Sequence, residues 1–140
     1  MTTARVRDAM VPEPRILERD ATAQEAGELL ARPEVRAVLV CDEGRLTGVI
    51  TRKTLVREVV AAGLDPRAAR AGDIAEEPLF TLDAGMALDE AFHTLEERDL
   101  ERVPVTEDGR LVGILSRSVL QRRLAEDEPP PDEDASAGPR

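Results

Sequence analysis

The apolar positions of this chain first follow the period of an amphipathic helix. From residue 23 onward an apolar residue recurs every three or four positions, as on one face of a helix. Thr22 and Glu25 have the spacing of a capping box, in which each side chain bonds the other's backbone N–H group. Pro33 is expected to end or disturb this helix. The apolar face predicted for it consists of Ala23, Ala26 and Leu30.

The period then changes to that of two short strands joined by a tight turn. An apolar strand is expected at 37–41 and a return strand at 46–50, with Gly44 available for a positive φ in the turn. Thr51 is a suitable N-cap for a second helix, and Gly63 suits its end. The apolar stripe predicted for this second helix consists of Leu55, Val56, Val59 and Val60.

The same succession of elements returns in the second half of the chain, where position 103 corresponds to position 38. Nine of 20 aligned positions are identical between Val38–Arg57 and Val103–Arg122, where chance would give roughly one or two. The first helix face also recurs, at Leu88, Ala91 and Leu95, although its N-cap threonine is replaced by alanine. Such a repeat directs the search for function to the space between two similar half-sites.

The repeat divides the chain into four segments. A chain of 140 residues has the size of one compact domain. Each ~60-residue copy would be marginally stable alone, so the two copies are expected to pack together. The segment that follows Ala125 combines three consecutive prolines with acidic and small residues, which predicts a disordered tail. The predicted boundaries are 1–63 for the first repeat, 64–71 for the linker, 72–125 for the second repeat and 126–140 for the tail.

Composition and charge narrow the class of partner. The chain has no Trp or Tyr and only two Phe residues, so the core is expected to be aliphatic. Broad aromatic platforms for stacking nucleic-acid bases are missing. The net charge is −10, half of it in the tail, and this acidity repels nucleic acids and anionic membranes. Nucleic-acid binding is therefore disfavoured, and no membrane partner is expected.

Targeting signals and catalytic constellations are both missing from the sequence. It has no signal-peptide core and no run of the ~18 apolar residues that a membrane span needs. A single cysteine, Cys41, excludes an intramolecular disulfide, and together these features predict a cytoplasmic protein. With His93 as the only histidine, no Cys/His metal cluster or Cys–His pair is expected, nor any cofactor or enzymatic activity. The carboxylates of Glu76 and Glu77 are interpreted as solvated surface.

Three motifs of the repeat resemble the CBS domain, a family named after cystathionine beta-synthase. They are the Asp-x-Met motif Asp8–Met10 and the two Gly-hydrophobic-hydrophobic-Thr/Ser-Arg motifs Gly48–Arg52 and Gly113–Arg117. The resemblance covers about residues 5–125 and implies an α+β fold of two β-α-β-β-α repeats packed about a pseudo-two-fold axis. It also implies a homodimer that binds AMP, ADP, ATP or S-adenosylmethionine between its repeats. Such pairs regulate a partner protein and do not catalyse a reaction themselves.

The two strand-to-helix junctions have the chemistry of a phosphate site. Backbone N–H groups at the start of a helix favour an anion. The hydroxyls of Thr51 and Ser116 can donate to a phosphate oxygen, and Arg52 and Arg117 can supply paired donors. By resemblance to the family, the adenine would lie against Pro14, Arg15, Ile16, Pro78, Leu79 and Phe80, and against the strand starts Val38, Leu39, Arg102, Val103 and Pro104.

Position 54 and its counterpart 119 depart from the family pattern. The family places there an aspartate whose carboxylate accepts both ribose hydroxyls, whereas this chain has Thr54 and Val119. Thr54 offers one uncharged acceptor and Val119 offers none. A hydrogen bond to a charged group is worth ~1.5–3 kcal/mol, so its loss would weaken binding roughly 10- to 150-fold. The second cleft is therefore expected to be the poorer site.

Each of these features also has a purely structural interpretation. Thr51 and Ser116 would serve as helix N-caps, and the two arginines would pair with surface acids. The motif glycines Gly48 and Gly113 are expected to serve close packing of the backbone rather than ligand contact. Two functions therefore stay open. One is a stand-alone regulatory module that binds an adenosine derivative, and the other is a ligand-free dimerisation or protein-interaction module with degenerate clefts.

Overall fold

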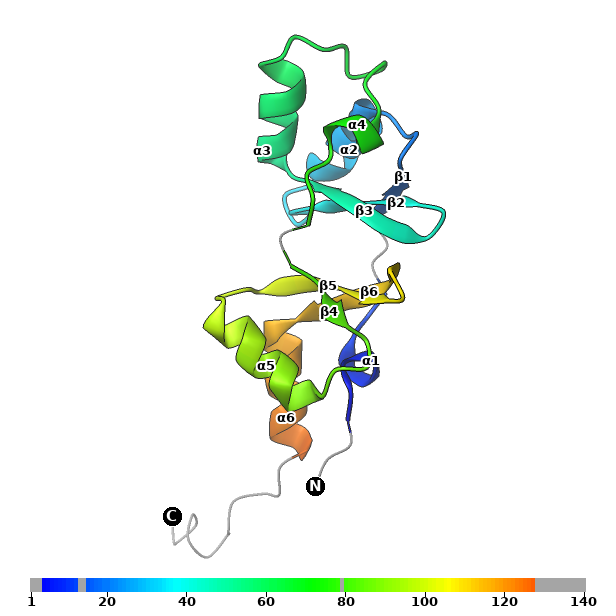
Figure 1. Ribbon diagram of the computed structural model, residues 1–140. Helices are drawn as coiled ribbons and strands as arrows, with labels where there is room; N and C mark the ends of the chain where they lie inside the picture. The colour runs from blue at the N-terminus through cyan, green and yellow to red at the C-terminus, as the bar shows by residue number, and fades with distance from the viewer. Residues whose placement is uncertain (1–3, 13–14, 79, 128–140) are drawn as a thin grey trace, which may run out of the picture.

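Two similar halves are stacked with their sheets facing each other and their helices on the outside (Figure 1). The structure is a computed structural model that describes residues 4–12, 15–78 and 80–127. The candidate site residues Pro14 and Leu79, and all but the first two residues of the expected tail, lie outside the described residues. The architecture confirms the predicted α+β fold of two β-α-β-β-α repeats related by a pseudo-two-fold axis.

In each repeat a short helix precedes the β-α-β-β-α order. The elements of the first repeat are α1 (Val6–Ala9), β1 (Ile16–Glu18), α2 (Ala23–Leu30), β2 (Val38–Asp42), β3 (Arg45–Ile50), α3 (Arg52–Leu55) and its π-helical continuation η1 (Val56–Val60). The elements of the second repeat are α4 (Ala71–Ile74), β4 (Leu82–Asp83), α5 (Leu88–Glu97), β5 (Arg102–Glu107), β6 (Arg110–Ser116) and α6 (Arg117–Asp127).

Two three-stranded sheets meet at their hairpin turns, where a bridge connects them into one continuous six-stranded order, β1-β2-β3-β6-β5-β4. One residue pair, Arg45 with Arg110, joins the sheets. The φ angles are 53° at Glu43 and 87° at Gly44, as in the hairpin turn predicted there. The Arg110 guanidinium lies over Gly44, and Arg45 lies over Gly109 in the same way. These reciprocal contacts place the pseudo-two-fold axis between the two turns.

The leading segments of the two repeats, residues 4–11 and 71–76, are exchanged between the halves. Val6 and Ala9 lie in the core of the second half, and Ala71 lies in the core of the first. Figure 1 shows α4 beside α2 at one end of the molecule and α1 beside α5 at the other. Each leading segment forms one helical turn, α1 or α4. A sequence repeat is therefore not a complete packing unit.

The aliphatic core predicted from composition is present as two separate clusters of Leu, Val, Ile and Ala, one in each half. The predicted helix faces point into these clusters. In the first half, Ala23, Ala26 and Leu30 are at most 2% exposed. The corresponding three residues of α5 are fully buried. Each half therefore has a hydrophobic centre of its own, completed by the leading segment of the other half.

The four residues of the apolar stripe predicted after Thr51 do not form a single buried face. Val59 is 4% exposed and Leu55 is half-buried, but Val56 is 58% and Val60 is 71% exposed. Positions 55 and 59 lie one turn apart on the inner side, whereas 56 and 60 are rotated by about 100° around the helix axis. The first repeat therefore presents an apolar strip to its outer surface.

Candidate functional site

The chain passes from the first half to the second through a crossing segment, residues 76–78 and 80–81. This segment lines a cavity between the two sheets. Glu76 pairs with Val49 of β3 through two backbone hydrogen bonds of 2.8 and 2.9 Å. Further along the segment, Pro78 and Phe80 line a cavity of about 460 Å³. This volume lies within the roughly 300–1,000 Å³ that is usual for small-molecule sites. The lining residues are Leu46, Pro78, Phe80, Thr81, Thr106 and Gly109.

The cavity brings together two of the candidate adenine contacts, Pro78 and Phe80. The guanidinium carbon of Arg98 lies 4.6 Å from the centroid of the Phe80 ring, a cation–π contact that supports the ring from one side. Thr81 and Thr106 complete the lining, although sequence reasoning did not single them out. Thr81 directly follows Phe80 in the sequence, whereas Thr106 comes from β5 and meets this segment only in the fold.

Thr51 and Ser116 act as helix N-caps at the two strand-to-helix junctions. The backbone N–H of Thr54 donates to Thr51 Oγ1 at 3.3 Å, and the backbone N–H of Thr51 donates to Thr54 Oγ1 at 3.0 Å. The backbone N–H of Val119 donates to Ser116 Oγ at 3.2 Å. The N-cap role expected for both hydroxyls is therefore confirmed. Thr51 Oγ1 also lies 3.0 Å from Thr54 Oγ1 and is the donor of that contact, because Thr54 donates its single hydroxyl proton to Glu76. A phosphate oxygen would therefore have to compete with Thr54 for the Thr51 proton.

Arg52 and Arg117 both reach back to the loop that follows the first long helix of their own half. Arg52 Nη2 donates to the carbonyl of Arg32 at 2.8 Å. Arg117 forms ion pairs of 3.3 Å with Asp99 and 3.6 Å with Glu101, and its side chain is 28% exposed. An anionic ligand would have to compete with these internal contacts at either junction.

Thr54 is buried and its hydroxyl is bound to a carboxylate from the crossing segment. Thr54 Oγ1 donates to Glu76 Oε2 at 2.7 Å, and Arg57 Nη2 donates to the same oxygen at 2.5 Å. The interpretation of Glu76 as plain solvated surface is therefore wrong, although its side chain remains 44% exposed. The counterparts of Thr54 and Glu76 in the other repeat are Val119 and Val11, so this polar network belongs to one junction only.

The Glu76 network predicts a pH-dependent contribution to stability. The hydrogen bond from Thr54 and the Arg57 guanidinium lower the pKa of Glu76 below its ordinary value. The carboxylate therefore stabilises the fold above the unfolded-state pKa of about 4.3, and this contribution is lost as the pH falls through the lowered value. The free energy of unfolding of the wild type should exceed that of Glu76→Gln most at neutral pH and converge with it towards pH ~3. Urea denaturation across this range measures the difference, and a pH-independent difference would contradict the assignment.

The remaining candidate contacts lie on strands or, for Arg15, directly before β1, and three of the seven have buried side chains. Val38 and Val103 are at most 2% exposed and belong to the two cores, and Leu39 is 4% exposed. Any contact they make with a ligand would therefore come from the backbone. Ile16 on β1 is 39% exposed, and the carbonyl of Arg15 accepts a hydrogen bond from the Leu39 N–H at 3.1 Å. Arg102 and Pro104 lie on β5.

Gly48 and Gly113 let the leading segment of the other repeat lie directly against the strand. A Cβ atom at Gly48 would lie 2.6 Å from the Cβ of Ala75. At Gly113 it would lie 2.8 Å from Met10 Sδ and 2.9 Å from the carbonyl oxygen of Val11. All three distances are shorter than a Cβ atom tolerates, so the packing role expected for these glycines is confirmed.

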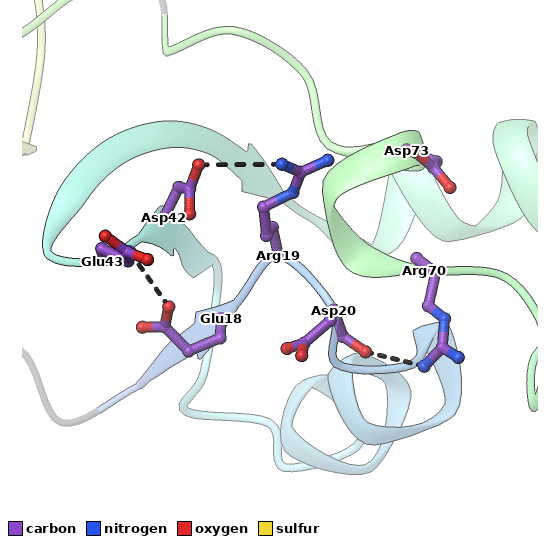
Figure 2. A pocket seen from close by; sticks show the side chains of 7 residues that line it. All are labelled: Glu18, Arg19, Asp20, Asp42, Glu43, Arg70 and Asp73. Carbon is purple, nitrogen blue, oxygen red and sulfur yellow. Dashed lines mark hydrogen bonds and ion pairs between the residues drawn. The ribbon is translucent and has the colours of Figure 1, made fainter.

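A larger cavity of about 560 Å³ lies in the first half, where β1, the β2–β3 turn and α4 meet. Figure 2 shows that both of its guanidinium groups are engaged. Arg19 pairs with Asp42 at 3.7 Å, and Arg70 Nη1 donates to the carbonyl of Asp20 at 2.8 Å. Five carboxylates surround these two cations and disfavour an anionic ligand. The lining residues are Glu18, Arg19, Asp20, Asp42, Glu43, Arg70 and Asp73.

The remaining chemistry-bearing residues stand apart from both cavities. Cys41 is 2% exposed, and its burial raises the pKa of the free thiol. His93 is exposed on α5. In the described part of the chain, no three His, Cys, Asp or Glu side chains are placed to hold a metal ion. Within the same residues, no helix has both the length and the apolar character needed to cross a membrane.

Comparison with known proteins gives one consistent result. Hypoxic response protein 1 of Mycobacterium tuberculosis is 35% identical over 127 residues, which span 90% of this chain and 87% of that protein. The crystal structure of Hypoxic Response Protein I with two coordinated zinc ions superposes with a TM-score of 0.71 at 30% identity, covering 86% of this chain and 98% of that one. CBSX2 in complex with AMP superposes with a TM-score of 0.66 at 25% identity, covering 87% of this chain and 96% of that one.

The family assignment rests on the repeat itself. The CBS domain pattern matches twice, over residues 6–61 and 71–126. These ranges contain both strand-to-helix junctions and both hairpins described above. The chain therefore belongs to the CBS domain family and contains two CBS domains in tandem.

Proposed function

We propose that this chain is a stand-alone regulatory CBS pair that binds an adenosine derivative between its repeats and regulates a partner protein without catalysing a reaction. The observation that carries the proposal is the cavity of about 460 Å³ between the two sheets, with Pro78 and Phe80 in its lining. A lining that combines Pro78 and Phe80 with the two threonines Thr81 and Thr106 suits a flat heteroaromatic base with polar edges. The AMP bound by CBSX2, which shares this fold, supports the same class of ligand.

Nucleotide binding should appear as thermal stabilisation. AMP, ATP or S-adenosylmethionine at ten times its dissociation constant is expected to raise the Tm by roughly 3–8 °C, because it binds the folded state alone. Phe80→Ala should weaken binding about tenfold by removing the ring from the cavity. His93→Ala changes an exposed residue on α5 and serves as the control. Folded protein that shows no stabilisation by any of the three ligands at millimolar concentration would contradict the proposal.

A ligand-free interaction module is the second candidate function. It is favoured by the internal contacts of Arg52, Thr54 and Arg117, which occupy groups that would otherwise face a nucleotide. In this alternative the cavity stays empty and the protein acts by assembly alone. Both candidate functions involve a homodimer, so ligand titration is the direct way to distinguish them. The ligand-free module also requires a dimer that forms without ligand, so a dimer that forms only with a nucleotide would exclude it.

The surface proposed for the homodimer is the apolar strip of the first repeat, Val56, Val60 and Leu64. These residues are 58%, 71% and 46% exposed. The counterparts of Val56 and Val60 in the second repeat are Gln121 and Ala125, so the strip is confined to one end of the molecule. A two-fold axis through the strip would bring each apolar side chain against its copy, which is the self-complementary arrangement that such an axis requires. The two protomers would thus meet through their first repeats.

A charge in the centre of this strip should separate the protomers. Val60→Asp is expected to convert a dimer into a monomer at micromolar concentration, because two carboxylates would face each other across the axis. Ala125→Asp introduces the same charge at the equivalent exposed position of the second repeat and should leave the dimer intact. Sedimentation velocity measures both variants. A wild-type protein that is monomeric across this range, or a dimeric Val60→Asp variant, would refute the interface.

A further inference from the structure

Glu76 holds one carboxylate oxygen in place and leaves the other open. Thr54 and Arg57 both donate to Oε2, at 2.7 and 2.5 Å. Oε1 accepts no hydrogen bond from the residues that the structure describes, and 44% of the side chain is exposed. Two donors on one oxygen fix the plane of the carboxylate, and its second oxygen keeps its full capacity to accept. The result is an oriented, solvent-accessible acceptor.

The backbone fixes where this acceptor lies. Glu76 is held on β3 by its two hydrogen bonds with Val49, beside the junction where Thr51 starts α3. Two residues further on, Pro78 lines the cavity between the sheets. Glu76 thus lies between the start of the continuous helix α3–η1, which suits a phosphate, and the cavity lined by Pro78 and Phe80, which suits a base. In a nucleotide that spans these two places, the group between them is the sugar.

The second repeat provides an internal comparison. Val11, the counterpart of Glu76, makes the same pair of backbone hydrogen bonds to Ile114, at 2.9 and 2.8 Å. Val119 stands at the position of Thr54. The backbone arrangement is therefore kept at both junctions, and the oriented carboxylate is present at one. In the second repeat the segment is held against the strand although Val11 and Val119 replace Glu76 and Thr54. The polar network is therefore not needed to hold the backbone in place, and its presence requires another explanation.

We propose that Glu76 recognises the sugar of the bound adenosine derivative, with Oε1 accepting a hydrogen bond from a ribose hydroxyl. This inference rests on the function proposed above and assigns its sugar specificity to one residue. It makes the first junction selective for ribose over deoxyribose and leaves the second without such selectivity. Thr54 and Arg57 are positioning residues, because they orient the carboxylate without contacting the sugar.

Calorimetric titration with AMP, 2′-deoxy-AMP and 3′-deoxy-AMP tests the assignment on the full chain. Wild-type protein is expected to bind AMP roughly 10- to 150-fold more tightly than the analogue that lacks the contacted hydroxyl. Glu76→Gln should lower the affinity for AMP to near that of this analogue and leave the affinity for the analogue itself unchanged. Glu77→Gln removes the same charge from the neighbouring exposed residue and should behave like the wild type.

The outcomes separate this inference from the function beneath it. If the wild type binds AMP and both deoxy analogues equally, the role of Glu76 is overturned while nucleotide binding stands. If Glu76→Gln weakens all three ligands by the same factor, Glu76 is only a structural contact and the inference fails. If the wild type binds none of the three, the proposed function fails together with the inference. The comparison among ligands on the wild type needs no variant, so a poorly folded Glu76→Gln protein would not obscure the result.

Discussion

Replacing Gly48 by valine is expected to destabilise the protein by roughly 2–4 kcal/mol. The new Cβ would lie 2.6 Å from the Cβ of Ala75 and 3.1 Å from the carbonyl oxygen of Glu76. To relieve this overlap the leading segment must move away from β3, which breaks the two hydrogen bonds between Val49 and Glu76. Urea denaturation monitored by circular dichroism measures the loss. An unchanged unfolding midpoint would show that the close approach does not exist in solution.

Gly27 provides the matched control for this substitution. It lies inside α2, and the nearest atom to an added Cβ would be Leu55 Cδ1 at 3.8 Å. Gly27→Ala therefore meets no obstacle and should stabilise the protein by up to about 1 kcal/mol, because alanine is the better helix former. Opposite signs at the two positions would confirm that close approach, and not the loss of a glycine, causes the effect at Gly48.

A charge in the leading segment of the first repeat should unfold the second half preferentially. Val6 is fully buried in the cluster formed by α5, β5 and β6. Val6→Asp would place a carboxylate there without a partner, at a cost of roughly 3 kcal/mol or more. Hydrogen exchange is expected to show loss of protection in α5 and β5 before α2, since the two cores are separate and can open separately.

The mirror substitution at Ala71, the counterpart of Val6 in the second repeat, should reverse this order. Ala71 is fully buried in the core of the first half, so Ala71→Asp is expected to expose α2 and β2 before α5. If each variant instead weakened the half to which it belongs in sequence, the exchange of leading segments would be refuted. If both halves lost protection together in both variants, the two cores would form a single cooperative unit, contrary to the prediction.

The internal repeat explains why much of the fold could be predicted. Thr22 and Glu25 form the capping box that their spacing predicts, with hydrogen bonds of 2.8 and 3.2 Å. The turn at Gly44 has the expected positive φ. These features depend on residues within four positions of one another, so their geometry follows from local spacing. The recurrence of the turn and of the helix face in the second repeat distinguishes them from chance patterns.

The candidate site was predicted less completely because its parts are far apart in sequence. Pro78 and Phe80 line the cavity from the crossing segment, whereas Thr106 reaches it from β5. Glu76 is bound to Thr54, 22 residues away, and no periodicity links the two positions. The exposure of Val60 was not predicted either. An apolar stripe does not indicate which of its side chains face the core and which face solvent.

The sequence by itself determined the duplication, the order of elements, the turns and caps, and the membership of the CBS family. All of these arise from local spacing or from the comparison of one repeat with the other. Only the tertiary structure decided that the leading segments change places, that a carboxylate from the crossing segment meets Thr54, and that the cavity opens between the sheets. The physical reason is that burial and close approach depend on which distant surfaces pack together, and a linear pattern of apolar residues does not specify the partner.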